Sequence, residues 1–154
     1  MHRAFFLGGL MCLYISAAAQ EAGQTSVIHK AAAAKFATLP NIPDCMTVFV
    51  ERGDPARGAS VVQVRMTPGC DSQSHWHTSD ANVMFVSGAV QFGMKGEKPT
   101  VMQRGDLAFL PSHHIHGEKC GGSAPCAFFA YLYSPFDVHY VDEARVKKSH
   151  RNGR

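Results

Sequence analysis

The stretch from residue 69 to residue 88 reads GCDSQSHWHTSDANVMFVSG and decides the fold of this 154-residue chain. It places His75 and His77 one residue apart, ahead of an apolar run that ends at Gly88. Side chains at positions i and i+2 of a β-strand point to the same face of a sheet. We therefore expect both imidazoles to face one side of a strand and Trp76 the other. Two neighbouring imidazoles are a natural start for a Zn, Fe, Cu, Mn or Ni site.

The sequence on both sides of this stretch is typical of short β-strands. Residues 60–66 (SVVQVRM) alternate apolar and polar side chains, as a half-buried strand does. Similar runs separated by Gly and Pro predict strands at 46–51, 60–66, 82–87, 89–94, 101–102, 106–110, 127–133 and 138–141, with the two histidines at the edge of another. This pattern indicates an all-β chain that forms one antiparallel sandwich or barrel.

A second stretch, residues 105–116, combines glycine, proline and histidine at fixed spacing. The residues that share this spacing in the two stretches are Gly69, His75, His77, Gly88, Gly105, Pro111 and His116. They resemble the two characteristic motifs of the cupin superfamily, and the resemblance extends over about residues 45–141. The HWHT element, the GDP turn at 53–55 and the PFDVHY element at 135–140 are similar to those of small exported bacterial single-domain cupins.

The resemblance implies a single-domain antiparallel β-barrel of the cupin or jelly-roll type, with a metal site at its mouth. The implied metal ligands are His75, His77 and His116. Cupins usually add a glutamate, which would fall at position 81 or 82, but this chain has Ala81 and Asn82 there. We expect Asn82 to add at most a weak amide oxygen. Three imidazoles without a carboxylate should not favour Mn or Mg.

The same resemblance indicates what the site does. Three histidines with open coordination positions suit zinc-bound hydroxide or ferrous iron, and nearby methionines make copper a third candidate. The implied function is a metal-dependent oxygenase or lyase/isomerase acting on a small molecule. The alternative is a non-catalytic cupin that binds a small ligand or metal and has lost its glutamate. Cupins commonly dimerise, so a homodimer is also expected.

His113 stands where the second motif usually has glycine. In the family frame this position lies near the barrel mouth, so His113 is a candidate catalytic proton shuttle near pH 7. The competing interpretation is a solvated loop residue.

The ends of the chain predict an exported protein. Residues 1–3 supply a positive start through Arg3, residues 4–15 are apolar, and residues 16–19 are small, which together predict a cleaved secretory signal at 1–19. A membrane anchor is the alternative, but the apolar run is shorter than the ~20 residues a bilayer requires. We expect a periplasmic or secreted product with an N-terminal segment at 20–43, the barrel at 44–142 and a disordered basic tail at 143–154. Residues 26–35 are predicted to form a short helix.

Charge and cysteine content support this picture. Loss of Arg3 with the signal leaves 14 basic against 12 acidic residues, a net charge of +2, which argues against nucleic-acid binding. The mature form contains no segment that could span a membrane. Its four cysteines are Cys45, Cys70, Cys120 and Cys126. Four cysteines in an exported chain suggest disulfides. Four cysteines allow three pairings, and the sequence does not choose among them. The turn-forming spacer between the last two is compatible with a bridge there, which would leave the first two to pair; four reduced thiols are the alternative.

Overall fold

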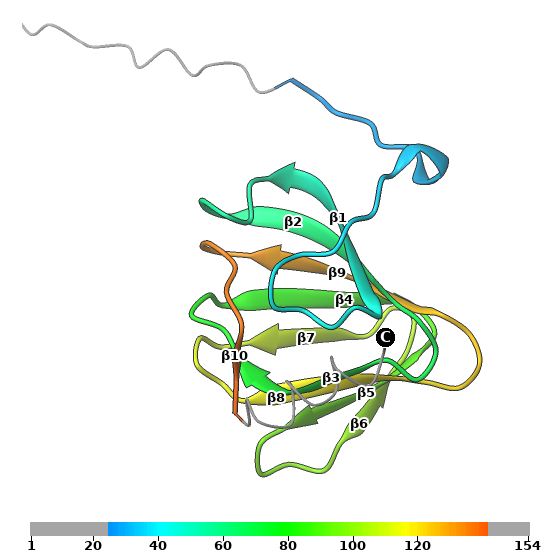
Figure 1. The fold of residues 1–154 in the computed structure, drawn as a ribbon, viewed down its shortest axis with the longest axis vertical. Helices are drawn as coiled ribbons and strands as arrows, with labels where there is room; N and C mark the ends of the chain where they lie inside the picture. The colour runs from blue at the N-terminus through cyan, green and yellow to red at the C-terminus, as the bar shows by residue number, and fades with distance from the viewer. Residues whose placement is uncertain (1–24, 142–154) are drawn as a thin grey trace, which may run out of the picture.

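The computed structural model describes residues 25–141 as two five-stranded antiparallel sheets that form a jelly-roll barrel (Figure 1). The order of strands is β1-β2-β9-β4-β7 in the first sheet and β10-β3-β8-β5-β6 in the second. The strands are β1 (Met46–Gly53), β2 (Ser60–Met66), β3 (Asp71–Trp76), β4 (Ala81–Ser87), β5 (Ala89–Met94), β6 (Thr100–Met102), β7 (Leu107–Leu110), β8 (His116–Gly121), β9 (Cys126–Leu132) and β10 (His139–Tyr140). The predicted all-β antiparallel barrel is confirmed.

Alternation of side chains places the core between the two sheets. In β4, Ala81, Val83 and Phe85 are buried, and the residues between them are exposed or half-buried. In β2, alternate residues from Ser60 to Met66 are buried in the same way. Each sheet therefore lines the interior with every second residue, and a side chain's parity along its strand decides whether it can reach a site inside the barrel.

The register between β3 and β8 brings the two sequence motifs together. Strand β8 pairs antiparallel with β3, and His75 lies opposite His116 in the pairing. The two strands lie side by side in the second sheet (Figure 1). No strand was predicted at 116–121, because two of its three interior positions are polar: β8 buries His116, Glu118 and Cys120.

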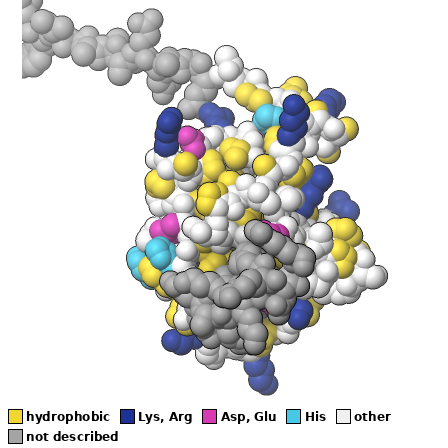
Figure 2. All heavy atoms as spheres, in the orientation of Figure 1, with side chains coloured by type: hydrophobic (Ala, Val, Ile, Leu, Met, Phe, Trp, Pro, Cys, Tyr) yellow, Lys and Arg dark blue, Asp and Glu magenta, His cyan; other side chains and the backbone are white. Residues whose placement is uncertain are grey.

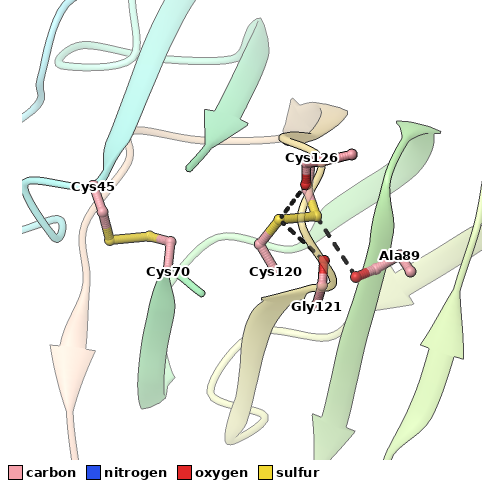
Figure 3. The surroundings of a disulfide bond; sticks show 7 residues. Cys45, Cys70, Ala89, Cys120, Gly121 and Cys126 are labelled. Carbon is pink, nitrogen blue, oxygen red and sulfur yellow. Dashed lines mark hydrogen bonds between the residues drawn. A yellow bond between two sulfur atoms is a disulfide. The ribbon is translucent and has the colours of Figure 1, made fainter. Parts of the chain in front are cut away.

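Two disulfides join strands and loops at one end of the barrel (Figure 3). Cys45 pairs with Cys70 across 25 positions, and Cys120 pairs with Cys126 across 6. The expectation of disulfides is confirmed, and the structure selects one of the three pairings that the sequence left open. Gly88 packs against the second bridge with φ 74°, and a Cβ at this position would lie 2.7 Å from the Cys126 sulfur, so the motif glycine is sterically required.

The segment before the barrel is mostly extended. The helix predicted over 26–35 is a single 3-10 turn, Ala31–Ala33, without a side-chain cap. Among residues 25–141, no helix is long and apolar enough to cross a bilayer. The predicted signal at 1–19 and tail at 143–154 lie outside the described residues. On the face shown in Figure 2, Lys and Arg side chains are spread around the molecule without forming one continuous basic surface.

Candidate metal centre

Three histidines from two neighbouring strands meet inside the barrel. His75 lies on β3, His77 follows the end of β3, and His116 begins β8. One ring nitrogen from each lies within 4.8 Å of those of the other two. His75 and His116 are only 2% and 3% exposed. Metal–nitrogen bonds of about 2.1 Å require the nitrogens to close by up to about 1.5 Å, which small side-chain rotations can supply.

Backbone carbonyls fix the orientation of all three rings. The Nδ1 atom of His75 donates to the Gln73 carbonyl at 2.7 Å, and that of His116 donates to the His114 carbonyl at 2.8 Å. His77 donates its Nδ1 proton to the Asp137 carbonyl. Each neutral ring therefore keeps a free lone pair on Nε2. Metal-binding histidines are commonly oriented by such a hydrogen bond at the other nitrogen.

Burial keeps these rings neutral. Desolvation, followed by the charge of His75, lowers the pKa of His77 to about 4, and the same two causes lower that of His116 to about 4. Desolvation also lowers the pKa of His75. Only neutral imidazole can bind a metal ion, so the three rings are ready to bind at neutral pH without releasing protons.

The cluster opens onto a small and largely apolar cavity of about 80 Å³. Its apolar walls include Val62, Val83, Phe92, Phe128 and Leu132. Its polar lining, besides the three histidines, consists of Ser72, Glu118 and Tyr140. A mainly apolar pocket with a few convergent polar groups is typical of a small-molecule site.

Sequence reasoning missed Glu118. It lies two residues after His116 on β8, so it faces the same interior, and it is 8% exposed. Its Oε2 atom lies 4.0 Å from Nε2 of His75 and has no hydrogen-bond partner among the described residues. Desolvation raises the pKa of Glu118 to about 7, against the smaller lowering effects of His116 and Ser72. The period-2 relation to His116 was the signal that could have found it.

The two residues at the usual glutamate position are separated by the parity of β4. Ala81 is 3% exposed and lines the cavity, whereas Asn82 is exposed on the outer face. The Asn82 amide donates to the Tyr133 hydroxyl. The expectation that Asn82 adds a ligand is therefore wrong in this structure, because the strand directs its side chain away from the histidines.

His113 also lies apart from the described lining of the cavity. It is exposed, and its ring stacks on Trp76 with centroids 4.7 Å apart. Trp76 stacks in turn on His139, at 3.9 Å. The backbone of His113 has φ 61°, the left-handed conformation that explains why the family motif has glycine at this position. Its catalytic role stays a prediction.

Comparisons with known proteins agree on the fold. A family model described as "Cupin domain" matches residues 62–132. The polyketide cyclase RemF from Streptomyces resistomycificus is 16% identical with a TM-score of 0.67, covering 77% of this chain and 87% of its own. The DMSP lyase DddQ from Ruegeria pomeroyi is 19% identical with a TM-score of 0.57, covering 66% and 57%. A cupin sugar phosphate isomerase from Silicibacter pomeroyi is 20% identical with a TM-score of 0.58, covering 72% and 79%. No curated protein sequence matches.

Proposed function

Because this chain belongs to the cupin superfamily, and because three histidines meet inside its barrel, we propose that it is a metal-dependent enzyme acting on a small molecule. His75, His77 and His116 hold the divalent ion, and the reaction is of the lyase or isomerase type. The observation that carries this proposal is the set of three Nδ1 hydrogen bonds to backbone carbonyls, which leave three Nε2 lone pairs free.

The chemistry follows from the groups around the cluster. A divalent ion supplies a Lewis acid that polarises a substrate oxygen. Burial of Tyr140 raises its pKa, so its hydroxyl stays protonated at neutral pH and can donate a hydrogen bond to bound substrate. The apolar walls exclude water, and the volume of about 80 Å³ admits a molecule of few atoms or the reacting end of a larger one. A cyclase, a lyase and an isomerase among the structural neighbours are consistent with small substrates.

Elemental analysis of the protein purified from its native compartment, without added metal, tests the site. We expect near-stoichiometric zinc, iron or copper in wild type and none in His77→Ala or His116→Ala. Zinc would support lyase/isomerase chemistry, and iron or copper would redirect the proposal to an oxygenase. The matched control is His29→Ala, because His29 is exposed and lies outside the cluster. Equal metal content in all four proteins would refute the three-histidine site.

A second candidate is a non-catalytic cupin that binds a ligand or metal, favoured by the alanine at position 81. Substrate-class screening of the metal-loaded protein separates the two. A protein that holds its metal in the three-histidine site but converts no small oxygenated or unsaturated compound would support the binding function.

Export and dimerisation complete the proposal. Two disulfides are consistent with a periplasmic or secreted protein, and N-terminal sequencing of the native product tests cleavage after residue 19. The outer face of the first sheet exposes large apolar side chains, including Leu107 (71%) and Phe109 (54%). We propose that this face pairs with a second copy, and light scattering that returns a monomer mass would reject it.

A further inference from the structure

We propose that Glu118 supplies the fourth ligand of the metal site, from β8, in place of the glutamate that this chain lacks on β4. The inference rests on the proposed three-histidine site and deepens it. It concerns a residue outside the two sequence motifs that define the family resemblance.

The position of Glu118 follows from the pairing of β8 with β3. His75 lies opposite His116, and Ser72 lies opposite Glu118. Glu118 is therefore the next interior residue along β8 from His116, on the same side of the sheet. Both side chains line the cavity. The Glu118 carboxylate therefore lies on the same sheet as His75 and His116.

The contact between Glu118 and His75 brings two polar atoms face to face in the interior. Because His75 uses its Nδ1 proton on the Gln73 carbonyl, its Nε2 atom is a hydrogen-bond acceptor. That atom faces Oε2 of Glu118, which is also an acceptor once the carboxyl group is ionised, at 4.0 Å. Two acceptors facing each other in a water-poor interior are unfavourable unless a positive charge lies between them. A divalent ion bound by both atoms satisfies both, and two ligands of one ion are separated by about 3–3.5 Å, close to the observed distance.

The other side chains around Glu118 give Oε2 no hydrogen bond among the described residues. This atom is buried and has no hydrogen-bond partner among residues 25–141. A buried polar atom without a partner costs about 1–3 kcal/mol, so it requires an explanation. Ala81 leaves the cavity without a carboxylate from β4, and three neutral imidazoles alone would leave a dication uncompensated. A Glu118 carboxylate bound to the ion would give Oε2 a partner and would also supply negative charge to the dication.

Calorimetric titration of Zn²⁺ into chelator-stripped protein tests the assignment. We expect Glu118→Gln to weaken Zn²⁺ binding by at least ~100-fold, beyond the ~10–100-fold typical of residues that only support a ligand. Asp71→Asn is the matched control, since Asp71 is an exposed carboxylate near Glu118 that pairs with Lys119 on the outside. It should bind Zn²⁺ as wild type does. Thermal melts of the metal-free variants establish that each is folded.

Two further measurements separate a ligand from a neighbour. The visible spectrum of bound Co²⁺ should change in position and intensity in Glu118→Gln, because loss of a carboxylate changes the coordination sphere. Adding Ala81→Glu to the Glu118→Gln variant returns a carboxylate from the opposite wall, and it should restore most of the Zn²⁺ affinity.

These measurements distinguish a failure of the three-histidine site from a failure of Glu118 as its fourth ligand. If wild type binds neither Zn²⁺ nor Co²⁺, or if His116→Ala binds them equally well, the proposed function fails. If His116→Ala abolishes binding while Glu118→Gln keeps wild-type affinity and an unchanged Co²⁺ spectrum, only the fourth ligand is refuted, and Glu118 instead shares a proton with His75.

Discussion

Replacement of Glu118 by Gln in the metal-free protein should change the pH dependence of its stability. Burial raises the pKa of Glu118 from 4.5 to about 7, with desolvation as the largest cause. Between these pH values the native state keeps a proton that the unfolded chain has released, so wild-type stability falls as the pH rises. At about 1.36 kcal/mol per pKa unit, the loss reaches about 3 kcal/mol above pH 7. Glutamine is of similar size and carries no charge, so the variant should not suffer this loss.

Denaturant unfolding of both proteins, after treatment with chelator, measures the difference directly. At about pH 4.5 the two free energies of unfolding should lie closest together, and at about pH 8 the variant should gain about 3 kcal/mol over wild type. The lowered pKa values of His77 and His116 give the opposite slope between about pH 4 and 6.5, where stability rises with pH. That slope is present in both proteins, so subtraction isolates the carboxyl group.

A difference between the two proteins that is the same at both pH values would refute the reasoning. It would mean that the carboxyl group ionises in the native state as readily as in the unfolded chain, through water or a donor that reaches Oε2. The prediction has the opposite sign to the effect of the same substitution on metal binding. A variant that is more stable without metal but binds Zn²⁺ weakly cannot be explained as a general folding defect.

Three other predictions use different parts of the barrel. In the Glu118→Gln background, Zn²⁺ affinity should stay nearly constant from about pH 7.5 to about pH 5.5, because the cluster histidines are already neutral; a fall that begins near pH 6.5 in calorimetric titrations would contradict their lowered pKa values. His113→Gly should be more stable than His113→Ala by about 1 kcal/mol in urea unfolding, since glycine accepts a φ of 61° without strain, and equal stabilities would refute this. Replacing the Cys45–Cys70 pair by alanines should cost about 3.5 kcal/mol and replacing Cys120–Cys126 about 2 kcal/mol, because the first bridge closes the longer loop; the reverse order in thermal melts would refute the loop-entropy account.

The sequence predicted best the elements whose interior is apolar. Strands at 60–66 and 89–94 were placed with the bounds that the structure has, because alternation of valine or phenylalanine with other residues marks the buried face. The strand at 116–121 was missed because its interior residues are histidine, glutamate and cysteine, with glycines beside them. Hydrophobic periodicity cannot detect a strand whose interior positions are occupied by polar residues of a site.

The direction of side chains along strands also explains which residues of the candidate site were predicted correctly. Spacing identified the three histidines, because their geometry follows from strand parity and from the pairing of two motifs. Asn82 was considered a ligand only because it lies near the expected position in sequence, although one residue along a strand reverses the direction of a side chain. Glu118 was overlooked because no glutamate was expected on that strand.

In a closed barrel, a carboxylate on any strand that lines the cavity can lie close to an ion inside it. Ala81 on β4 and Glu118 on β8 belong to different sheets, yet both line one cavity. A divalent ion in that cavity is stabilised by a nearby negative charge from either wall, since Coulomb attraction depends on distance and not on chain position. Loss of the usual glutamate therefore does not by itself indicate loss of the metal. What decides the matter is whether any buried carboxylate remains within reach of the histidines, and Oε2 of Glu118, 4.0 Å from His75, meets that condition.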